Sequence, residues 1–528
     1  MTACFHPVGC MLGALLMLAI GIVPAAAQDA RPAPPDTIRS RQALVSADTL
    51  VGAAEDYNEL LGHVFVQQDS TLLQSQRALE YVTRKTLFFT GNVLIVERGD
   101  TLRADSVHYD QRTKVGHARG RVFLTDGDVE VRAPSAVYYA NEKRTRFEEG
   151  VTLVDSAATI TSRSGTYWSD EKRAELDGDV VMHAERTYLE ADSLTYFRET
   201  EVSLASGNVF IERLGGGEES DADSTLRTLL FSQWAFNDQQ AGLSRVRGHP
   251  LLVQLRQDST DADVDTLIIQ AVHLEALEQD TLLRLIAVDS VRIWKTDLAA
   301  VADSIVYERL KVAADTSAAE TAPADSGAVD PIEETRLFRS PMLWVGEAQV
   351  SGDTLRVKGR RNAIDSLFVR RTAFVAQRDT LTGRIHQLKG RHLVGVFEDD
   401  STRVFTVGPN AETIYFQRDE QDRPDGGLQV SGDQAVFRFR GDKPQDIAFG
   451  EHEGTYYPEH LLPKPFALEG FLWVPERRPA KAPLLRDERV RERLAQYARP
   501  HRETSPASDP DAPTEADAAG RTPAPNQR

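Results

Sequence analysis

The amino-acid sequence predicts an all-β protein in which antiparallel hairpins are stacked one after another. The first observation behind this prediction is a strict internal repeat of 29 residues. A repeat of this length indicates one small structural unit that is copied and stacked along the chain. Its clearest markers are six valines at equal spacing: Val64, Val93, Val122, Val151, Val180 and Val209.

The second observation is the pattern around each valine, which identifies the first strand of each copy. Another apolar residue stands two positions later every time, whereas the residue between them varies. Side chains two apart point to the same face of a β-strand, so both members of each pair should face one side. The second members are Val66, Ile95, Leu124, Leu153, Met182 and Ile211.

A second strand follows in each full copy, marked by a serine three residues before a tyrosine. The tyrosines also recur every 29 residues, at Tyr109, Tyr138, Tyr167 and Tyr196. They fit two roles, either as braces between neighbouring strands or as aromatic side chains at the rim of a groove. The apolar or small residue two positions before each tyrosine shares its face, so this strand also has one apolar side.

Polar turns separate these strands and close each copy. Residues 98–100 and 126–128 have Gly and Asp between the two strands, and the polar clusters at 111–114 and 141–144 end a copy. Such sequences are typical of tight turns between strands. Each copy is therefore predicted to be an antiparallel hairpin, apolar inside and charged outside, and the copies should stack into a long sheet pair or an open barrel.

The domain organisation follows from where this pattern holds. We expect a signal peptide over 1–27, a linker over 28–42, and a first repeat region over 43–312. An acidic low-complexity insert should follow at 313–335, then a second, degenerate β-region over 336–475. The last part, 476–528, is predicted to be a short helix and a disordered tail, because its Pro- and Ala-rich end has almost no large apolar residues.

The second region keeps parts of the pattern. Val291, Ile293, Ser304 and Tyr307 repeat the offsets of the earlier copies before the insert. After the insert, strand-like runs are expected at 343–350, 411–416 and 434–439. Whether the two regions form one continuous unit or two consecutive units is left open by the sequence.

The N-terminus indicates export. An apolar run of 13 residues at 11–23 is too short to span a bilayer of about 30 Å, and three alanines follow it. This is typical of a cleavable signal peptide, although residues 1–10 contain no Lys or Arg. Both cysteines, Cys4 and Cys10, lie in this leader. The mature protein should therefore have no disulfide, thiolate metal site or cysteine nucleophile.

Charge and motif searches exclude several functions. The net charge of −19 argues against binding of nucleic acid or of anionic lipid head groups over a broad surface. A membrane-spanning barrel is disfavoured because exterior positions are charged and aromatics make up only 7% of the chain.

Asp261, Asp263 and Asp265 start like a calcium loop, but Thr266 and Val272 break the pattern. No catalytic motif is present, so we expect no enzyme, no metal and no cofactor.

At this point the repeats show a family resemblance. The runs Gly91-Asn92-Val93, Ala104-Asp105-Ser106 with Tyr109, and Ala191-Asp192-Ser193 with Tyr196 resemble the repeats of the OstA-like family. This is the organic-solvent-tolerance or lipopolysaccharide-transport family, whose best-known soluble member is LptA. The resemblance covers about residues 43–310 well. It covers 337–460 more loosely, where the sequence is similar to the long OstA-like proteins of the Bacteroidetes kind.

The resemblance implies a periplasmic protein with an elongated, twisted β-jellyroll, an open β-taco. Its apolar interior would carry the acyl chains of lipopolysaccharide or lipid A between the inner and outer membranes. Inner- and outer-membrane transport components would bind through edge-strand pairing, and head-to-tail self-association is a further expectation. The candidate groove lining is Val64, Val66, Val93, Ile95, Val122, Leu124, Val151, Leu153, Val180, Met182, Val209 and Ile211.

Two other interpretations remain open at the level of sequence. The same apolar residues would be needed if the interior were simply a packed core, as in an exported structural or adhesive β-solenoid. A β-solenoid enzyme acting on polysaccharides would need carboxylates on one face of adjacent copies. Asp105 and Asp192 occupy equivalent positions, but Pro134 and Arg163 stand between them in the repeat, so no carboxylate ladder is predicted.

Overall fold

The computed structural model describes residues 44–53, 56–68, 71–97, 100–125, 127, 129–155, 158–168, 170–214, 224–258, 264–279, 281–296, 298–310, 332–360, 363–397, 402–440 and 443–497. The signal peptide, the linker and the tail beyond 497 lie outside these residues, as do Asp261 and Asp263. Of the insert expected over 313–335, only 332–335 are described, and they open a strand. The chain divides into two compact units, Met1–Lys481 and Ala482–Arg528.

The repeat region of the first unit begins with long strands. Its strands are β1 (Leu44–Ser46), β2 (Thr49–Ala53), β3 (Tyr57–Gln68), β4 (Thr71–Tyr81), β5 (Thr86–Glu97), β6 (Asp100–Asp110), β7 (Val115–Thr125), β8 (Glu130–Tyr139), β9 (Arg144–Glu148), β10 (Val151–Val154), β11 (Ala158–Ser162), β12 (Ser164–Trp168), β13 (Arg173–Ala184), β14 (Thr187–Phe197) and β15 (Val202–Leu214).

The following strands continue to the other end of the unit. They are β16 (Ser224–Asp238), β17 (Leu243–Arg247), β18 (Leu251–Asp258), β19 (Val264–Gln270), β20 (His273–Gln279), β21 (Leu282–Lys295), β22 (Leu298–Leu310), β23 (Ile332–Phe338), β24 (Met342–Val345), β25 (Ala348–Ser351), β26 (Thr354–Arg360), β27 (Ala363–Arg378), β28 (Ile385–Phe397), β29 (Thr402–Gly408), β30 (Ala411–Arg418), β31 (Pro424–Gly432), β32 (Ala435–Arg440), β33 (Lys443–Phe449) and β34 (His452–Pro458).

Short helices follow the last strand. They are η3 (Glu459–Leu461), η4 (Pro475–Arg477), α1 (Lys481–Leu484) and α2 (Glu488–Tyr497), of which α2 belongs to the second unit. No helix in the described part of the chain is long and apolar enough to cross a membrane.

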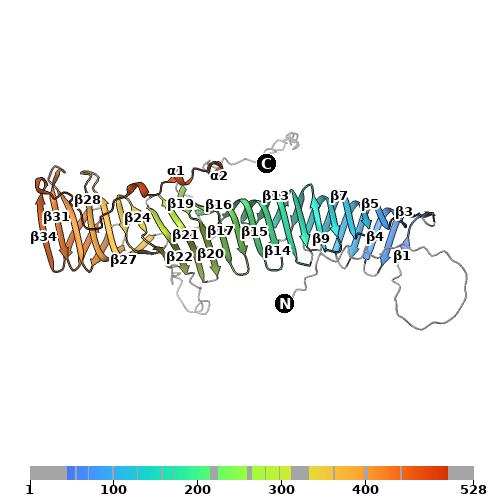
Figure 1. Cartoon of the computed structure of the whole chain (residues 1–528), viewed down its shortest axis with the longest axis horizontal. Helices are drawn as coiled ribbons and strands as arrows, with labels where there is room; N and C mark the ends of the chain where they lie inside the picture. Colours follow the sequence, from blue (N-terminus) through green and yellow to red (C-terminus); the bar gives the residue numbers. More distant parts are fainter. Residues whose placement is uncertain are drawn as a thin grey trace, which may run out of the picture. The chain divides into compact units, whose positions relative to one another are not determined.

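All described strands of the first unit belong to one antiparallel sheet of 34 strands, as the repeat pattern predicts. Figure 1 shows them in sequence order from β1 to β34. Long strands bend in the middle, so that β27 pairs with β26 through its first half and with β25 through its second half. The sheet is thus folded into two facing layers. The ladder continues past residues 311–331, because β22 pairs directly with β23.

The bend explains the Gly-x-Val motif of the repeat. In β5 the pairing register shifts between Thr90 and Val93, and the two residues between them, Gly91 and Asn92, have φ of +79° and +50°. Two consecutive left-handed residues turn the strand from one layer into the other, and glycine adopts this conformation without steric cost. Gly120 and Gly207 make the same corner in later copies.

The aspartate of the Ala-Asp-Ser motif lies beside this corner, on the preceding strand. A side chain at Gly120 would collide with the carboxylate of Asp105, which lies directly against the corner. Asp105 also accepts hydrogen bonds from the guanidinium of Arg121, the second residue of the corner. The two motifs of the repeat therefore meet in space, and each glycine makes room for the polar side chain beside it.

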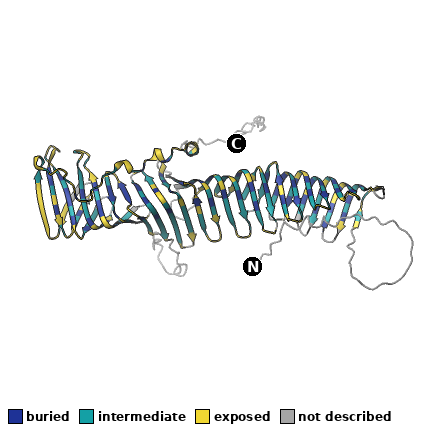
Figure 2. Ribbon diagram, viewed as in Figure 1, coloured by how far each residue is buried: buried dark blue, intermediate teal, exposed yellow. Residues whose placement is uncertain are grey.

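Each long strand contributes interior side chains on both sides of its corner. In β5 and β6 the interior residues are Leu87, Phe89, Val93, Ile95, Leu102, Ala104, Val107 and Tyr109, and none is more than 5% exposed. Figure 2 shows buried positions alternating with more exposed ones along the strands, as two-residue periodicity requires. The core therefore runs lengthwise between the two layers.

One expected strand is wrong. The run 343–350 forms two strands, β24 and β25, which pair with each other across a tight turn. Gly346 in this turn has φ of +54°, a conformation that breaks an extended strand and is favoured by glycine.

Candidate functional site

The twelve candidate lining residues all lie between the two layers of the first unit. The residues from Val64 to Val151 belong to one hydrophobic cluster, and Val180 and Val209 belong to the next. Leu153 packs against both clusters, so the apolar interior is continuous between them. All six repeat valines are at most 4% exposed.

The second member of each pair shows a gradient along the stack. Val66, Ile95 and Leu124 are at most 4% exposed, whereas Leu153, Met182 and Ile211 are only partly buried. Ile269 and Ile293, further along, are also only partly buried although they face the same interior. These residues stand nearer the rim than the valines. The rim of the interior is therefore closed in the first copies and partly exposed in the copies of Leu153, Met182 and Ile211.

A hollow lies where this change occurs. It has a volume of about 50 Å³, which corresponds to one or two water molecules. Apolar and aromatic side chains form its wall, whereas charged groups stand at its rim. It is lined by Leu124, Val129, Val131, Phe147, Val151, Leu153, Asp155, Thr166, Tyr167, Lys172, Ala174, Leu176, Tyr196 and Arg198.

Local strand breaks accompany the hollow. The chain that forms one long strand in β5 is here divided into β9 and β10, with Gly150 at φ of +106° between them. A smaller hollow of about 10 Å³ lies one copy earlier, where Gly116 and Ala118 occupy the positions of Leu87 and Phe89. Replacing large side chains by small ones leaves space that the neighbouring residues fill only in part.

Charged residues from both layers stand at the rim of the larger hollow. Asp155 follows β10 at the edge of one layer, whereas Lys172 and Arg198 stand at the edge of the other. Lys172 is paired with Glu199 at 3.6 Å. Burial raises the pKa of the Tyr196 hydroxyl, and the nearby carboxylates Asp155 and Glu201 raise it further. This tyrosine stays neutral at the mouth of the hollow.

The repeat tyrosines take different positions along the stack. Tyr109 is fully buried, and its hydroxyl has no hydrogen-bond partner among the described residues. Burial raises the pKa of Tyr109 to about 12. Tyr138 is also buried, whereas Tyr167 and Tyr196 are partly exposed and line the larger hollow. The first two fill the core, and the last two stand at the opening.

Half of the interior positions in each copy were neither among the candidates nor on the predicted apolar face of the second strand. They stand before the corner on the first strand, as Leu87 and Phe89 do, or at the start of the second strand, as Leu102 and Ala104 do. Their signal was present in the sequence, because Leu102 recurs as Val131, Ile160 and Leu189 at 29-residue spacing.

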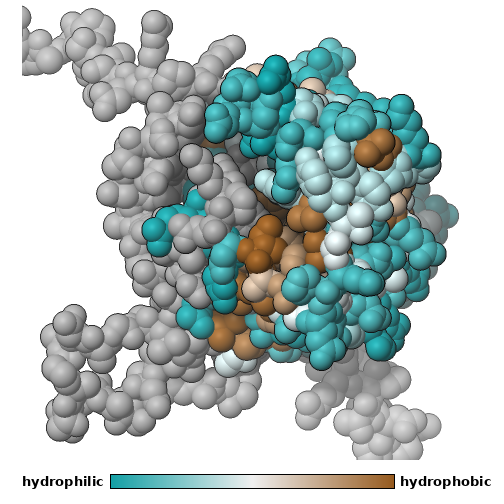
Figure 3. Space-filling view, turned by 90° about the vertical axis from the view of Figure 1, so that its left-hand side faces the viewer, coloured by the Kyte–Doolittle hydropathy of each residue, from teal (hydrophilic) through white to brown (hydrophobic). Residues whose placement is uncertain are grey.

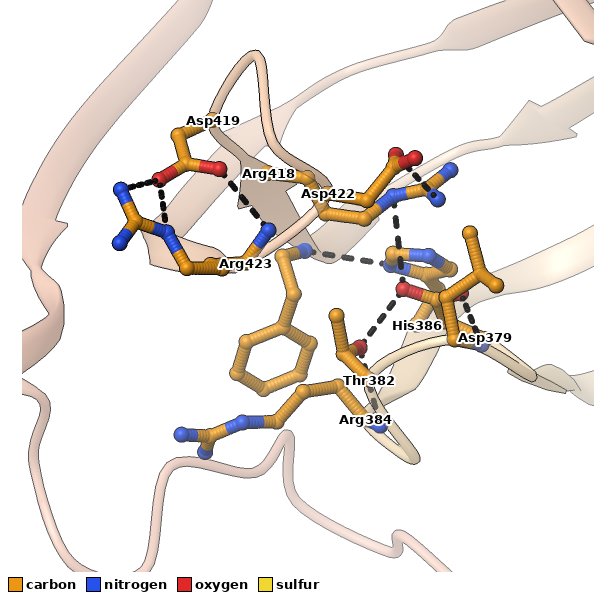
Figure 4. Close-up of polar contacts among 10 residues, drawn as sticks. Asp379, Thr382, Arg384, His386, Arg418, Asp419, Asp422 and Arg423 are labelled. Carbon is orange, nitrogen blue, oxygen red and sulfur yellow. Dashed lines mark hydrogen bonds and ion pairs between the residues drawn. The ribbon is translucent and has the colours of Figure 1, made fainter.

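A polar cluster on the later strands also has titratable groups with shifted pKa values, and Figure 4 shows it. The backbone N–H of Phe416 donates to His386 Nδ1 at 3.1 Å, and burial lowers the pKa of His386. Burial tends to raise the pKa of Asp379, but hydrogen bonds from Thr382 and the Leu381 amide, together with Arg418, outweigh it and lower that pKa.

These contacts hold turns in place rather than forming a reaction centre. Asp379 binds residues of its own turn through Thr382 Oγ1 at 2.6 Å, and Arg418 lies 3.6 Å from it. His386 is stacked on Tyr415 with ring centroids 4.5 Å apart. Among the residues that the structure describes, no three His, Cys, Asp or Glu side chains converge to hold a metal ion.

The two ends of the described sheet have unpaired edges. β1 and β2 both pair with β3 alone, and at the other end β33 pairs only with β32 and β34 only with β31. Figure 3 looks onto the end formed by these last strands and shows apolar side chains framed by polar ones. The interior is therefore visible from the end of the stack.

Comparison with known proteins gives matches of two kinds, to a family and to solved structures. The model of a family described as OstA-like protein matches residues 43–192. The crystal structure of LptH, the LptA-homologous periplasmic component of the conserved lipopolysaccharide transport device from Pseudomonas aeruginosa, is similar at 12% sequence identity. That match covers 26% of this chain and 84% of that chain, with a TM-score of 0.15. No curated protein matches the chain.

Proposed function

We propose, from the match of residues 43–192 to the model of the OstA-like family, that the protein carries acyl chains of lipopolysaccharide between the inner and outer membranes. The observation that supports this proposal most directly is the apolar rim, which is partly exposed at Leu153, Met182 and Ile211. Together with the exported leader expected at 1–27, it favours a periplasmic carrier.

The chemistry of the interior suits a ligand that must move along it. Corresponding positions in successive copies have similar aliphatic side chains, so a hydrocarbon chain would find near-equivalent sites 29 residues apart in sequence. Burying one methylene is worth about 0.8 kcal/mol, so a chain of a dozen carbons gains on the order of 10 kcal/mol. A row of such sites favours sliding over capture in one deep pocket.

Binding would require the layers to move apart. The hollow of about 50 Å³ is far too small for a long acyl chain. Among the described residues around Leu153 no strand pairing joins the two rims, so separation of the rims is the motion that we propose. Asp155 on one side and Lys172 on the other would then flank the opening.

The unpaired edges at β1–β2 and β33–β34 support the proposed partners. Open strand edges can extend a sheet into another protein by backbone hydrogen bonding. We therefore propose that membrane-bound transport components, or a second copy arranged head to tail, bind at these edges.

Site-specific photocrosslinking would test the carrier function. A photoreactive residue at Met182 or Ile211 should crosslink to lipopolysaccharide or lipid A, whereas one at Val66 should crosslink far less because that copy is closed. The matched control is Arg132, which points outward on β8 with an exposed side chain. Equal crosslinking at Arg132 and Met182, or none at any interior position, would contradict the proposal.

A scaffold without a lipid ligand is the second candidate. The tightly packed first copies favour it, because Val64, Val93 and Ile95 are at most 1% exposed. In that case the purified protein would contain no lipid, and exposure of Met182 and Ile211 to added lipid A would leave them uncrosslinked.

A further inference from the structure

The outer surface of the sheet changes character in the second half of the first unit. In β24, Leu343 faces the interior, so Met342 and Trp344 face outward, yet both are at most 6% exposed. Phe374 on β27 and Phe416 on β30 are also buried outward-facing residues, at 7% and 6% exposed. An apolar strip therefore crosses β24, β27 and β30 on the outside, where a soluble sheet normally has polar side chains.

A single extended segment covers this strip. Residues 462–474, named the strap, run across it after β34 and η3, and most of their large apolar side chains face the sheet, whereas Leu472 is exposed. Leu468 is 4% exposed and packs with Phe466, Phe471 and Trp473 against the cluster of Phe374, Ala376, Ile414 and Phe416. Val474 continues the contact to Met342 and Trp344.

Two buried glutamines hold the strap by its backbone. Gln349, 2% exposed, donates from Nε2 to the carbonyl of Leu472 at 2.8 Å and accepts from the N–H of Val474 at 3.1 Å. Gln387, 4% exposed, accepts from the N–H of Leu468 at 2.9 Å. A buried amide without such partners would be costly, so both glutamines are matched to a peptide backbone lying above them.

The strap is held differently from the strands beneath it. Its prolines, Pro463 and Pro465, lack the N–H that a ladder needs, and no described strand pairs with it. Further along, Arg478 donates to the carbonyl of Gly346 at 2.8 Å, and Lys481 lies over the ring of Trp294 at 5.2 Å. Segments held by few hydrogen bonds open more readily than ladders in the same protein.

We propose that the outer strip over β24, β25, β27, β28 and β30 is a peptide-binding groove and that the strap is its resident, detachable occupant. The groove recognises an extended apolar, proline-containing peptide. Gln349 and Gln387 form hydrogen bonds with the peptide's backbone. The apolar strip, which includes Trp344, Phe374 and Phe416, packs against its large side chains. The strap can leave this groove while the β-ladder below stays folded.

Hydrogen exchange on the full-length chain tests detachment. The amides of Leu468 and Val474 should exchange at least 100-fold faster than ladder amides of β27 and β28, because their release needs only local opening. Gln349→Leu should speed exchange at Val474 about tenfold further, because the side chain of residue 349 then loses its hydrogen bonds to the Leu472 carbonyl and the Val474 N–H. Gln377→Leu, an exposed amide on β27, is the matched control and should change nothing. Exchange of the strap only together with β27 and β28 would overturn the proposal.

Peptide binding tests the groove itself. Leu468→Asp in the full-length chain should displace the strap, and a fluorescent peptide of residues 462–474 with the natural Leu468 should then bind this variant with micromolar affinity. Adding Gln349→Leu and Gln387→Leu should weaken that binding at least tenfold.

The unaltered protein should bind the same peptide poorly, since its groove is occupied. Unchanged exchange protection of β5 and β6 confirms that each variant is folded. Failure of the folded Leu468→Asp variant to bind, or equal binding by the unaltered protein, would contradict the proposal.

Discussion

At the scale of single residues, the corner glycines determine the fold of each copy. Gly120 adopts φ of +74° and lies against Asp105, so it is needed both for its backbone conformation and for its lack of a side chain. Gly127 has φ of +95° in a turn with no atom within 4 Å of a Cβ. Comparing alanine substitutions at the two glycines therefore separates the free-energy cost of the left-handed backbone from the cost of the collision with Asp105.

Substituting these glycines should give unequal losses. Gly127→Ala should lower the free energy of unfolding by about 1 kcal/mol, because a non-glycine residue is placed in the left-handed region. Gly120→Ala should cost about 2 to 4 kcal/mol, because the added Cβ also displaces Asp105. Urea titrations of the two variants give the comparison, and equal losses would show that the collision is relieved without cost.

Tyr109 supports a prediction about pH. Its folded-state pKa is raised to about 12 from an ordinary 10, so the neutral form is favoured in the folded chain. The stability that this provides is present below pH 10 and is lost as pH rises from 10 to 12. Tyr109→Phe should remove this part of the alkaline loss. At pH 7 its stability should equal or exceed that of the unaltered protein, because the buried hydroxyl lacks a partner. A large loss at pH 7 would contradict this assignment.

At the scale of elements, the sequence predicted the hairpin and its repeat but only half of its interior. The apolar pairs that mark the first strand lie after each Gly-x corner, so the pattern predicts that the strand begins there. In the structure β5 passes through the corner, and Leu87 and Phe89 precede it. Leu87 and Phe89 have the same two-residue phase as Val93 and Ile95, but Gly91 takes the in-phase position between them, so the row of apolar side chains has a gap at the corner.

The strap lay beyond sequence-based prediction for a different reason. It has no periodicity, since it is neither strand nor helix over 462–474. Its position depends on Gln349 and Gln387, which are more than 80 residues before Leu468 or Val474 in the chain. Isolated glutamines give no local pattern, so only the tertiary structure shows what they hold.

His386 joins the hairpins of β27–β28 and β30–β31 and makes their stability depend on pH. Burial lowers its pKa below the ordinary 6.5, so the unfolded chain takes up a proton first as pH falls. The contribution of neutral His386 is therefore complete above pH 6.5 and declines below it. His386→Gln should flatten the pH dependence of exchange at the Phe416 amide between pH 6.5 and 5. If the pH dependence of exchange at the Phe416 amide is unchanged in this variant, groups other than His386 cause it.

At the scale of the whole first unit, the accessible and closed copies share one uninterrupted ladder. Opening of the rims around the larger hollow should therefore be local, and the first copies should stay closed. The twelve candidates did not reveal this difference, because their types are alike in every copy. Their exposure depends on which other side chains pack around them in the folded stack, which the residue types do not show.

Spin labels can measure that opening, since residues 44–528 contain no cysteine. With labels at Asp155→Cys and Arg198→Cys, electron-electron distances should lengthen when lipid A is added. Labels at Thr125→Cys and Lys114→Cys, at the rims of the closed copies, should show no change. Equal lengthening at both pairs would indicate a global change of twist instead.

The repeated corner also makes the length of the stack proportional to the number of copies. Each copy adds two strands at about 4.8 Å spacing, so 29 residues lengthen the stack by about 10 Å and leave its cross-section unchanged. Gaining or losing a whole copy by duplication or deletion would therefore alter reach without disturbing the chemistry between the layers. The length of the stack is thus a heritable quantity that can change in steps of one hairpin.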